Sequence, residues 1–278
     1  MEQVIGDRNK LEKKFGVVEQ AALLPGFQRL SLVSYNIQAG IHSSRYHHYL
    51  TNSWQHLLPT RKKRENLERI AGLLRTFDVV GLQEVDSGGS RSEFIDQTEY
   101  LAYHAGFPYW SNQINRRLGR LALHSNGLLS RLKPHSIHDY KLPGLPGRGA
   151  LLIRFGENEA PFYLCILHLA LGRNARKKQL GFVSELIWGL PRVIVMGDLN
   201  CEIDSPEMKL LLKQGCLVDP LQDLKTYPSW NPRRKLDHLL VTPDLRTENV
   251  RAINFPGSDH LPVAMDIFVP VTHKKGVA

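Results

Sequence analysis

The sequence predicts an α/β domain with enough strands for two packed β-sheets. The chain has 278 residues, of which 42% are hydrophobic, so it is long enough to bury a large core. Strand-like and helix-like segments alternate along it, which is typical of α/β domains. From about residue 30 to the C-terminus no low-complexity linker, internal repeat or break in composition occurs, which favours a single domain.

Eight segments have the length and apolar character of strands, and turn-forming or polar residues bound them. Eight strands are sufficient for two sheets that pack face to face. In chain order, the expected strands are residues 30–38, 79–85, 126–130, 150–155, 162–169, 193–196, 236–241 and 261–269.

Three helices are expected between these strands. In the first, apolar residues recur at helical spacing from Leu67 to Leu74. The second has Ser205 as a candidate N-cap, Pro206 at the first helical position and Gly215 as a plausible stop. The third follows residue 174. The expected helices are residues 62–77, 206–215 and 174–187.

The N-terminal residues 1–28 are charged and weakly helical, and we interpret them as a lead-in segment before a domain that covers residues 29–278. The lead-in has no apolar core of a secretory signal, and no uninterrupted apolar run of about 18 residues occurs in the chain. The three cysteines lack Cys-x-x-Cys spacing, which fits a reducing compartment. We therefore expect a soluble, cytoplasmic monomer without a transmembrane segment.

The charge balance favours a polyanionic partner. With 36 basic and 27 acidic residues the chain carries a net charge of +9. Nucleic acid, an anionic membrane surface and a phosphorylated substrate all fit this charge.

Four of the expected strands end in a polar residue that lies on the same face of its strand as the apolar residues before it. Side chains two positions apart share a side of a strand, so Asn36, Glu84, His168 and Asp198 each end a mainly apolar column, provided that Gly197 introduces no bulge. If these columns face a shared core, the four groups converge where that core opens to solvent. Such a convergence is what a pocket requires.

Two Asp-His pairs follow late in the chain. Asp237 shares its side with the apolar residues two and four positions later, so we expect Asp237 to face inward and His238 to be structural. Asp259 and His260 follow Gly257 and Ser258, which supply a loop. Asn200 shares a side with Asp198.

The residue types suit a hard cation. Carboxylate and amide oxygens without thiolates are typical ligands of Mg²⁺ or Mn²⁺. The sequence contains no His-Glu-x-x-His, Gly-x-Ser-x-Gly or Gly-x-x-x-x-Gly-Lys-Ser/Thr motif, which argues against zinc proteases, serine hydrolases and P-loop enzymes. A metal, histidines and a carboxylate base together indicate phosphoester hydrolysis.

Six motifs, in order, resemble those of the endonuclease/exonuclease/phosphatase superfamily, the deoxyribonuclease I-like fold. They are VSYNIQ, DVVGLQEVD, LCILHLALGRNARKKQ, VIVMGDLN, KLDHLLV and SDHLPV, and they span about residues 30 to 270. The resemblance implies a four-layered α/β sandwich, with two mixed sheets face to face, helices outside, and an active site at one end of the sheets. Residues 29–278 would be the catalytic domain.

The resemblance also implies site roles. Glu84 would bind Mg²⁺ or Mn²⁺, with Asn36 and Asp259 completing the metal and phosphate site. Asp198 would orient or deprotonate the attacking water, with Asn200 beside it on the phosphate. The remaining residues have phosphate, proton-transfer or supporting roles: His168 on the phosphate or leaving group, His260 held in its tautomer by Asp237, and Gln38, Asn126, Arg176 and Gln179 at matching family positions.

The substrate is left open between classes. The usual motifs of abasic-site nucleases differ from this sequence at Gln83-Glu84-Val85-Asp86 and at His168. At His168 and in the Gln-Glu-Val core, the sequence more closely resembles the deoxyribonuclease and sphingomyelinase branches. Among four basic clusters, Arg233-Arg234-Lys235 is our best candidate for substrate contact, with Arg234 gripping phosphate near Trp230. We expect a phosphodiesterase that acts on DNA or RNA. The alternatives are a phosphodiesterase or phosphatase for phospholipid, sphingomyelin or inositol-phosphate head groups, and a binding protein without activity.

Overall fold

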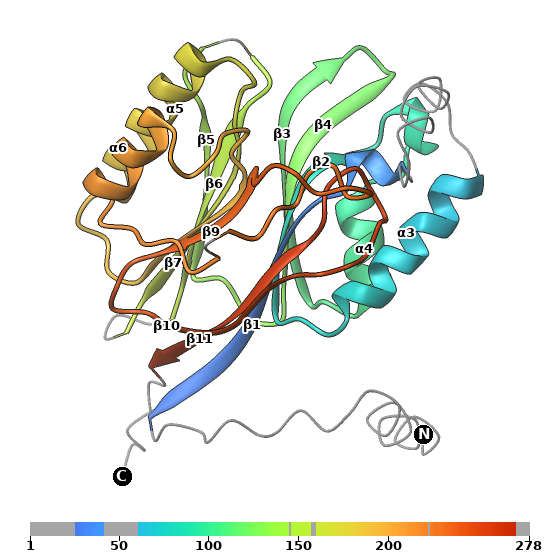
Figure 1. Ribbon diagram of the computed structural model, residues 1–278. Helices are drawn as coiled ribbons and strands as arrows, with labels where there is room; N and C mark the ends of the chain where they lie inside the picture. The colour runs from blue at the N-terminus through green and yellow to red at the C-terminus, as the bar shows by residue number, and fades with distance from the viewer. Residues whose placement is uncertain (1–25, 42–60, 145, 157–159, 222, 271–278) are drawn as a thin grey trace.

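The structure, a computed structural model, describes residues 26–41, 61–144, 146–156, 160–221 and 223–270. Two mixed β-sheets pack face to face, and each carries helices on its outer surface (Figure 1). The predicted four-layered α/β sandwich is confirmed. The helices are α3 (Arg61–Leu74) and α4 (Gln97–Ala105) over one sheet, and α5 (Arg173–Ile187) and α6 (Pro206–Gln214) over the other.

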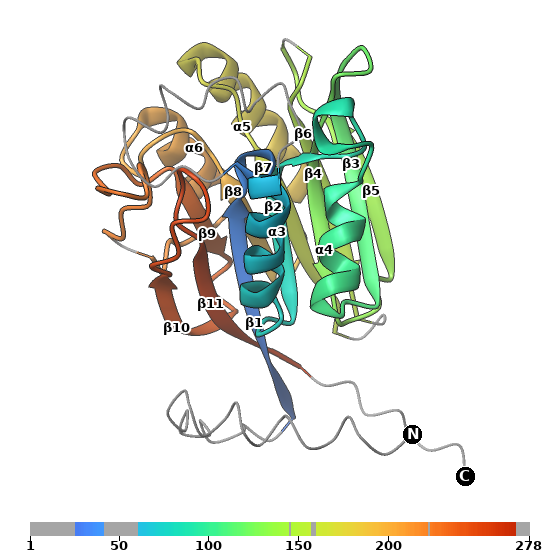
Figure 2. The same cartoon turned by 90° about the vertical axis from the view of Figure 1, so that its right-hand side faces the viewer.

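The six-stranded sheet has the order β10-β11-β1-β2-β4-β3 and lies behind α3 and α4 in Figure 2. Its β1 and β2 are parallel, and its other neighbours are antiparallel. The strands are β1 (Phe27–Asn36), β2 (Val79–Asp86), β3 (Tyr109–Leu118), β4 (Ala122–Ser130), β10 (Arg246–Ala252) and β11 (Val263–Pro270).

The five-stranded sheet has the order β5-β6-β7-β8-β9. Its β7 and β8 are parallel, and the remaining pairs are antiparallel. Each sheet therefore contains one pair of parallel strands. The strands are β5 (Ser136–Lys141), β6 (Gly149–Phe155), β7 (Phe162–His168), β8 (Val193–Asp198) and β9 (Asp237–Val241), and two short 3-10 helices complete the described elements, η1 (Gln38–Gly40) and η3 (Ser90–Ser92).

All eight predicted strands and all three predicted helices are present, with shifted ends. Strand β1 begins at Phe27, inside the expected lead-in, and residues 1–25 of that segment lie outside the described residues. The Ser205 side chain makes no capping hydrogen bond, although α6 begins at Pro206 as expected. The sequence prediction missed β3, β5, β10 and α4. The three missed strands are edges of their sheets, where fewer apolar side chains need burial.

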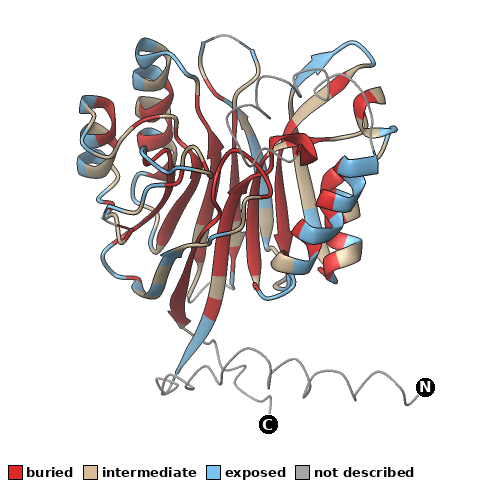
Figure 3. Ribbon diagram, turned by 45° about the vertical axis from the view of Figure 1, so that its right-hand side comes forward, coloured by how far each residue is buried: buried red, intermediate tan, exposed pale blue. Residues whose placement is uncertain are grey.

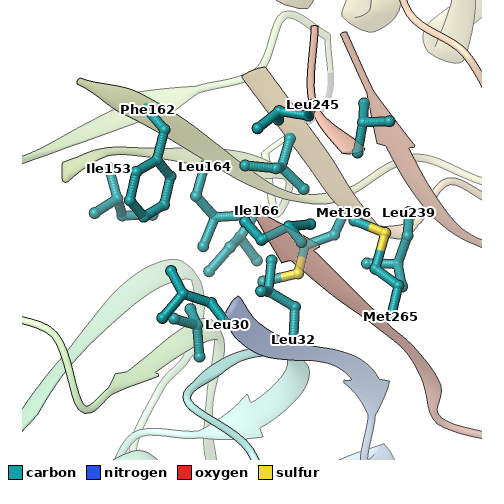
Figure 4. Packing of buried hydrophobic residues seen from close by; sticks show 14 of the residues in the cluster. Leu30, Leu32, Ile153, Phe162, Leu164, Ile166, Met196, Leu239, Leu245 and Met265 are labelled. Carbon is teal, nitrogen blue, oxygen red and sulfur yellow. The ribbon is translucent and has the colours of Figure 1, made fainter. Parts of the chain in front are cut away.

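A large apolar core fills the space between the two sheets. Leu32 and Met265 of the six-stranded sheet meet Ile166 and Met196 of the five-stranded sheet there (Figure 4). One further apolar cluster lies between the six-stranded sheet and its helices, and another lies between the five-stranded sheet and its helices. Inner strands such as β2 and β8 are buried along most of their length, whereas the helices expose one face to solvent (Figure 3). No helix in the described part of the chain combines the length and hydrophobicity that crossing a membrane requires.

The expected orientation of β2 is wrong. Val80 and Leu82 pack against α3 and α4, whereas Val79 faces the core between the sheets. Glu84 nevertheless reaches the inner side, because the pairing of β2 with β4 shifts register between Leu82 and Val85 and Glu84 adopts a φ of 54°. This β-bulge reverses the alternation at the end of the strand.

Candidate active site

The parallel strand pairs bring four of the predicted residues to one edge of the sandwich. His168 ends β7 directly opposite Asp198, which ends β8. The pairing stays regular through Gly197, so the expected column in β8 is confirmed. Asn36, at the end of β1 in the facing sheet, donates a hydrogen bond from Nδ2 to Asp198 Oδ2 over 3.1 Å. The two sheets are therefore joined at Asp198.

Asp198 is the centre of this cluster. Its Oδ2 lies 3.6 Å from His168 Nε2 and 3.7 Å from His260 Nε2. Glu84 approaches from the other sheet, with Oε1 3.8 Å from His168 Nε2 and about a third of its side chain exposed. Asp198, His168 and His260 are buried, so Glu84 forms the more open side of the cluster.

His260 forms a dyad with Asp237. Asp237 lies opposite Asp198 in the β8–β9 pairing, and its Oδ2 is 2.8 Å from His260 Nδ1. The Thr226 hydroxyl donates to the same carboxylate oxygen, and the Tyr227 ring packs 4.8 Å from the His260 ring. The dyad is thus held from several sides. The neighbouring His238 faces away, with Nε2 2.9 Å from the Cys201 carbonyl oxygen, as expected for a structural residue.

Burial and charge set the protonation states here. Burial would lower the pKa of His260, but the carboxylates of Asp237 and Asp198 outweigh it and hold that pKa well above its ordinary value. Burial raises the pKa of Asp198 to about 7. The positive charge of His260 lowers this pKa, whereas the negative charges of Asp237 and Glu84 raise it. At neutral pH, His260 is therefore a cation with a donor at each ring nitrogen.

Arg148 fixes the tautomer of His168. Its Nη1 lies 3.1 Å from His168 Nδ1, and because a guanidinium only donates, Nδ1 must accept. Burial, with the positive charge of Arg148 beside it, lowers the pKa of His168 well below its ordinary value. His168 is therefore neutral, and its proton sits on Nε2, which faces Glu84 and Asp198.

A loop tied to β1 carries Asp259 and His260. The Ser258 hydroxyl donates to the Asn36 carbonyl oxygen over 2.6 Å and accepts from the His260 amide over 3.1 Å. The Ser229 amide donates to the Asp259 carbonyl oxygen. These bonds explain how an Asp-His pair outside a strand places both residues near the end of β1.

A sequence profile of the Endonuclease/Exonuclease/phosphatase family matches residues 33–260, most of the chain and all of this cluster. The chain belongs to this family. Family members are divalent-metal-dependent phosphoric-ester hydrolases, and this chain is accordingly a metal-dependent phosphoesterase.

Solved structures share the fold at low sequence identity. An endonuclease/exonuclease/phosphatase from Beutenbergia cavernae DSM 12333 is 20% identical, with a TM-score of 0.67 over 87% of this chain and 72% of that chain. A mannosyl-6-phosphatase from Bacteroides thetaiotaomicron VPI-5482 is 16% identical, with a TM-score of 0.66 over 86% and 99%. A humanized D. rerio TDP2 with 14 mutations is 19% identical, with a TM-score of 0.61 over 86% and 98%. No curated protein matches the chain.

The residues of this endonuclease/exonuclease/phosphatase family site fit a hard divalent cation. The carboxylates of Asp198 and Asp237 have oxygens within 4.8 Å of each other, while the protonated His260 beside them has no lone pair for a metal. Burial raises the pKa of Asp259 to about 6, against the positive charge of His260, and the negative charge of Glu84 adds to this shift. Gln38 Oε1 and Asp237 Oδ1 are buried oxygens without a hydrogen-bond partner among the described residues. A cation with oxygen ligands would compensate these groups.

The other predicted residues divide into two groups. Asn126 is buried and donates to Gln113 Oε1 and the Gly149 carbonyl oxygen, while its own Oδ1 has no partner among the described residues. The Asn200 side chain donates from Nδ2 to the Leu169 carbonyl oxygen, and the Asn200 backbone amide donates to Asp198 Oδ1. These two and Gln38 lie beside the cluster, so their predicted support of the site stays a prediction.

Arg176 and Arg234 are placed differently. The Arg176 guanidinium binds Glu207 of α6, with Nη2 2.9 Å from Oε1, and the carbonyl oxygens of the loop before α5. Arg234 is paired with Glu202 at 3.5 Å, and the adjacent Lys235 is buried against Asp219. The geometry brings neither arginine to the cluster. The ion pair of Arg176 with Glu207 instead links α5 to α6.

The cluster opens into a cavity of about 450 Å³. Glu84 and His168 line the end next to the cluster, and Gln179 lines it from α5. Sequence reasoning missed three residues of this region: Arg148, Thr226 and Tyr227. They lie between strands, and no periodic pattern marks them, because their contacts depend on the paths of loops.

Proposed function

We propose that this enzyme is a Mg²⁺- or Mn²⁺-dependent phosphodiesterase that cleaves nucleic acid. The proposal rests on the convergence of residues from both sheets. Asn36 and Glu84 come from the six-stranded sheet, His168, Asp198 and Asp237 come from the five-stranded sheet, and His260 comes from the loop tied to β1. The net charge of +9 and the arginines of the β3–β4 hairpin favour a polyanionic substrate over a single phosphate.

Each residue has a role that its environment permits. Asp198 accepts a proton from the attacking water, since its raised pKa makes it a competent base near neutral pH. His260 donates from Nε2 to the phosphate or the leaving oxygen, and Asp237 holds its other nitrogen. His168 donates a hydrogen bond from Nε2 to a phosphate oxygen, because Arg148 occupies Nδ1. The backbone amide of Asn200 donates a hydrogen bond to Asp198 and orients its carboxylate.

The cation would be held by Glu84, Asn36 and Asp259. When bound, it supplies neutralisation of charge on the phosphate oxygens. Asn36 Nδ2 is engaged with Asp198, so only its Oδ1, which now accepts from the Gln38 amide, is available as a ligand. Of the two carboxylates, Glu84 is the more accessible.

A substrate panel tests the proposal. The substrates are plasmid DNA, single-stranded DNA, RNA, an abasic duplex, sphingomyelin, anionic phospholipid and inositol phosphates, each with Mg²⁺, Mn²⁺ or EDTA. We expect cleavage of DNA or RNA that EDTA abolishes. Hydrolysis of lipid or inositol phosphates without any cleavage of nucleic acid would overturn it and support a head-group phosphodiesterase or phosphatase. The solved relatives, which include a mannosyl-6-phosphatase and TDP2, do not choose between these classes.

A further inference from the structure

Three basic side chains line the cavity beyond the catalytic cluster. Arg116 and His124 lie directly opposite each other in the β3–β4 pairing, and Arg148 lies on the loop before β6. The Arg116 stem packs over the backbone before Arg148, since a Cβ on Gly147 would lie 3.3 Å from Arg116 Cδ. The three groups therefore form one wall of the cavity, with Glu84 as the carboxylate among its lining residues.

These arginines differ from the other basic residues near the site. Arg173 and Arg176 share Glu207, and Arg234 pairs with Glu202. Within the described part of the chain, neither Arg116 nor Arg148 has a salt bridge, and Arg116 has no hydrogen bond either. Burial lowers the pKa of Arg148, the negative charges of Glu84 and Asp198 oppose this shift, and the charge of Arg116 adds to it. The wall therefore carries two arginines with which no carboxylate among the described residues forms a salt bridge.

We propose that Arg116, His124 and Arg148 form a second anion subsite, which binds the phosphate next to the scissile phosphate in a nucleic-acid strand. This inference rests on the proposed function. One continuous cavity joins the wall to Glu84 and His168, and its volume of about 450 Å³ is within the range of small-molecule sites, enough for the nucleoside that links two phosphates. Guanidinium groups are the side chains best suited to grip a phosphate.

Arg148 connects the two sites, because it lines the subsite and also donates to His168 Nδ1. Arg116 contacts no residue of the catalytic cluster. A test of the subsite therefore uses Arg116. Arg117, the next residue in β3, is also exposed but does not line the cavity, and provides a matched control.

The experiment removes the charge from each partner in turn. The substrate is a single-stranded oligothymidylate in which a neutral methylphosphonate replaces the phosphate next to the mapped cleavage position, on either side. For the wild-type enzyme with Mg²⁺, we expect one of the two replacements to lower kcat/KM by about tenfold, typical of a lost charge-assisted contact. In Arg116→Gln, the same replacement should have a clearly smaller effect, of about threefold, because one partner of the phosphate is already gone while His124 and Arg148 remain.

Arg117→Gln should keep the tenfold effect, and Arg116→Lys should keep part of it. Thermal melting of each variant checks that it is folded. Equal cleavage of all oligonucleotides by the wild-type enzyme, or an undiminished effect in Arg116→Gln, would overturn the subsite and leave the nuclease function intact. If the wild-type enzyme cleaves no oligonucleotide, the nuclease function and the subsite both fall.

Discussion

Four residues of the candidate active site come from two pairs of parallel strands, β7–β8 and β1–β2, which place their last side chains in different ways. In β7–β8 the alternation continues to the final pair, His168 opposite Asp198. In β1–β2 it does not, since Glu84 reaches the site only through a bulge with a left-handed backbone. One half of the site follows from regular strand geometry, while the other depends on a local irregularity that has a conformational cost.

The regular half should carry the largest catalytic effect. Asp198→Asn keeps the shape and an oxygen that can accept from Asn36, but it loses the acceptor for the Asn200 backbone amide and removes the proton acceptor, so we expect kcat/KM to fall by about 10³-fold. Cleavage of single-stranded DNA in Mg²⁺ measures the loss. Because burial opposes ionisation of this carboxylate, the melting temperature in EDTA at pH 8 should be at least that of the wild type. Full activity in this variant would remove Asp198 from the mechanism.

A glycine makes the regular half possible. Gly197 has a φ of 145°, and a Cβ there would lie 1.9 Å from the Leu167 carbonyl oxygen. Gly197→Ala must therefore push β7 and β8 apart next to their catalytic ends, and we expect a loss of unfolding free energy of about 3 kcal/mol, comparable to other overpacked positions. Chemical denaturation measures it. Gly181→Ala, on α5 with open space around its Cβ, is the control and should not be destabilised.

The two halves also differ in how far the sequence alone could predict them. Alternation correctly placed His168, Asp198 and Asp237, because nothing interrupts the ladders of β7, β8 and β9. Alternation assigned the wrong face to Val80 and Leu82, because it was counted back from Glu84 across a bulge. No residue type in β2 predicts that bulge. A non-glycine residue with positive φ is uncommon, and pattern reasoning has no means to anticipate it.

Contacts made by loops were beyond prediction for a related reason. Arg148 on His168 and Thr226 on Asp237 come from segments without periodicity, so their positions follow from the packed structure. The family resemblance pointed to Glu84, which the structure places beside His168, although alternation had assigned the wrong face to the residues before it. The edge strands β3, β5 and β10 were missed because they are largely exposed, whereas the edge strand β9 is buried and was predicted.

The pH dependence of stability tests the alternation in β9, where Asp237 faces the site and His238 faces away. Burial lowers the pKa of His238, so the folded state keeps this ring neutral while the unfolded chain takes up a proton near pH 6.5. Stability is therefore present above pH 6.5 and is lost as the pH falls below it, by at most about 1.4 kcal/mol per pH unit for this residue.

Comparison with His238→Gln isolates this contribution. Denaturation between pH 7.5 and pH 5 should show a shallower loss of unfolding free energy in the variant, by up to one proton. An unchanged slope in His238→Gln would mean that this ring is protonated in the folded state, contrary to its buried environment.

The bulge itself is tested by separating the charge of Glu84 from its backbone. Glu84→Gln removes the carboxylate and keeps the left-handed conformation, whereas Glu84→Gly removes the carboxylate and relieves the conformation, with φ at 54°. Both variants should lose activity with Mg²⁺. The glycine variant should be the more stable of the two by about 1 kcal/mol, since relief of strain exceeds the extra entropy of the unfolded chain. Denaturation in EDTA measures the difference, and a less stable glycine variant would show that the bulge is not strained. The expected result would mean that this half of the site retains a destabilised backbone because the carboxylate is needed there.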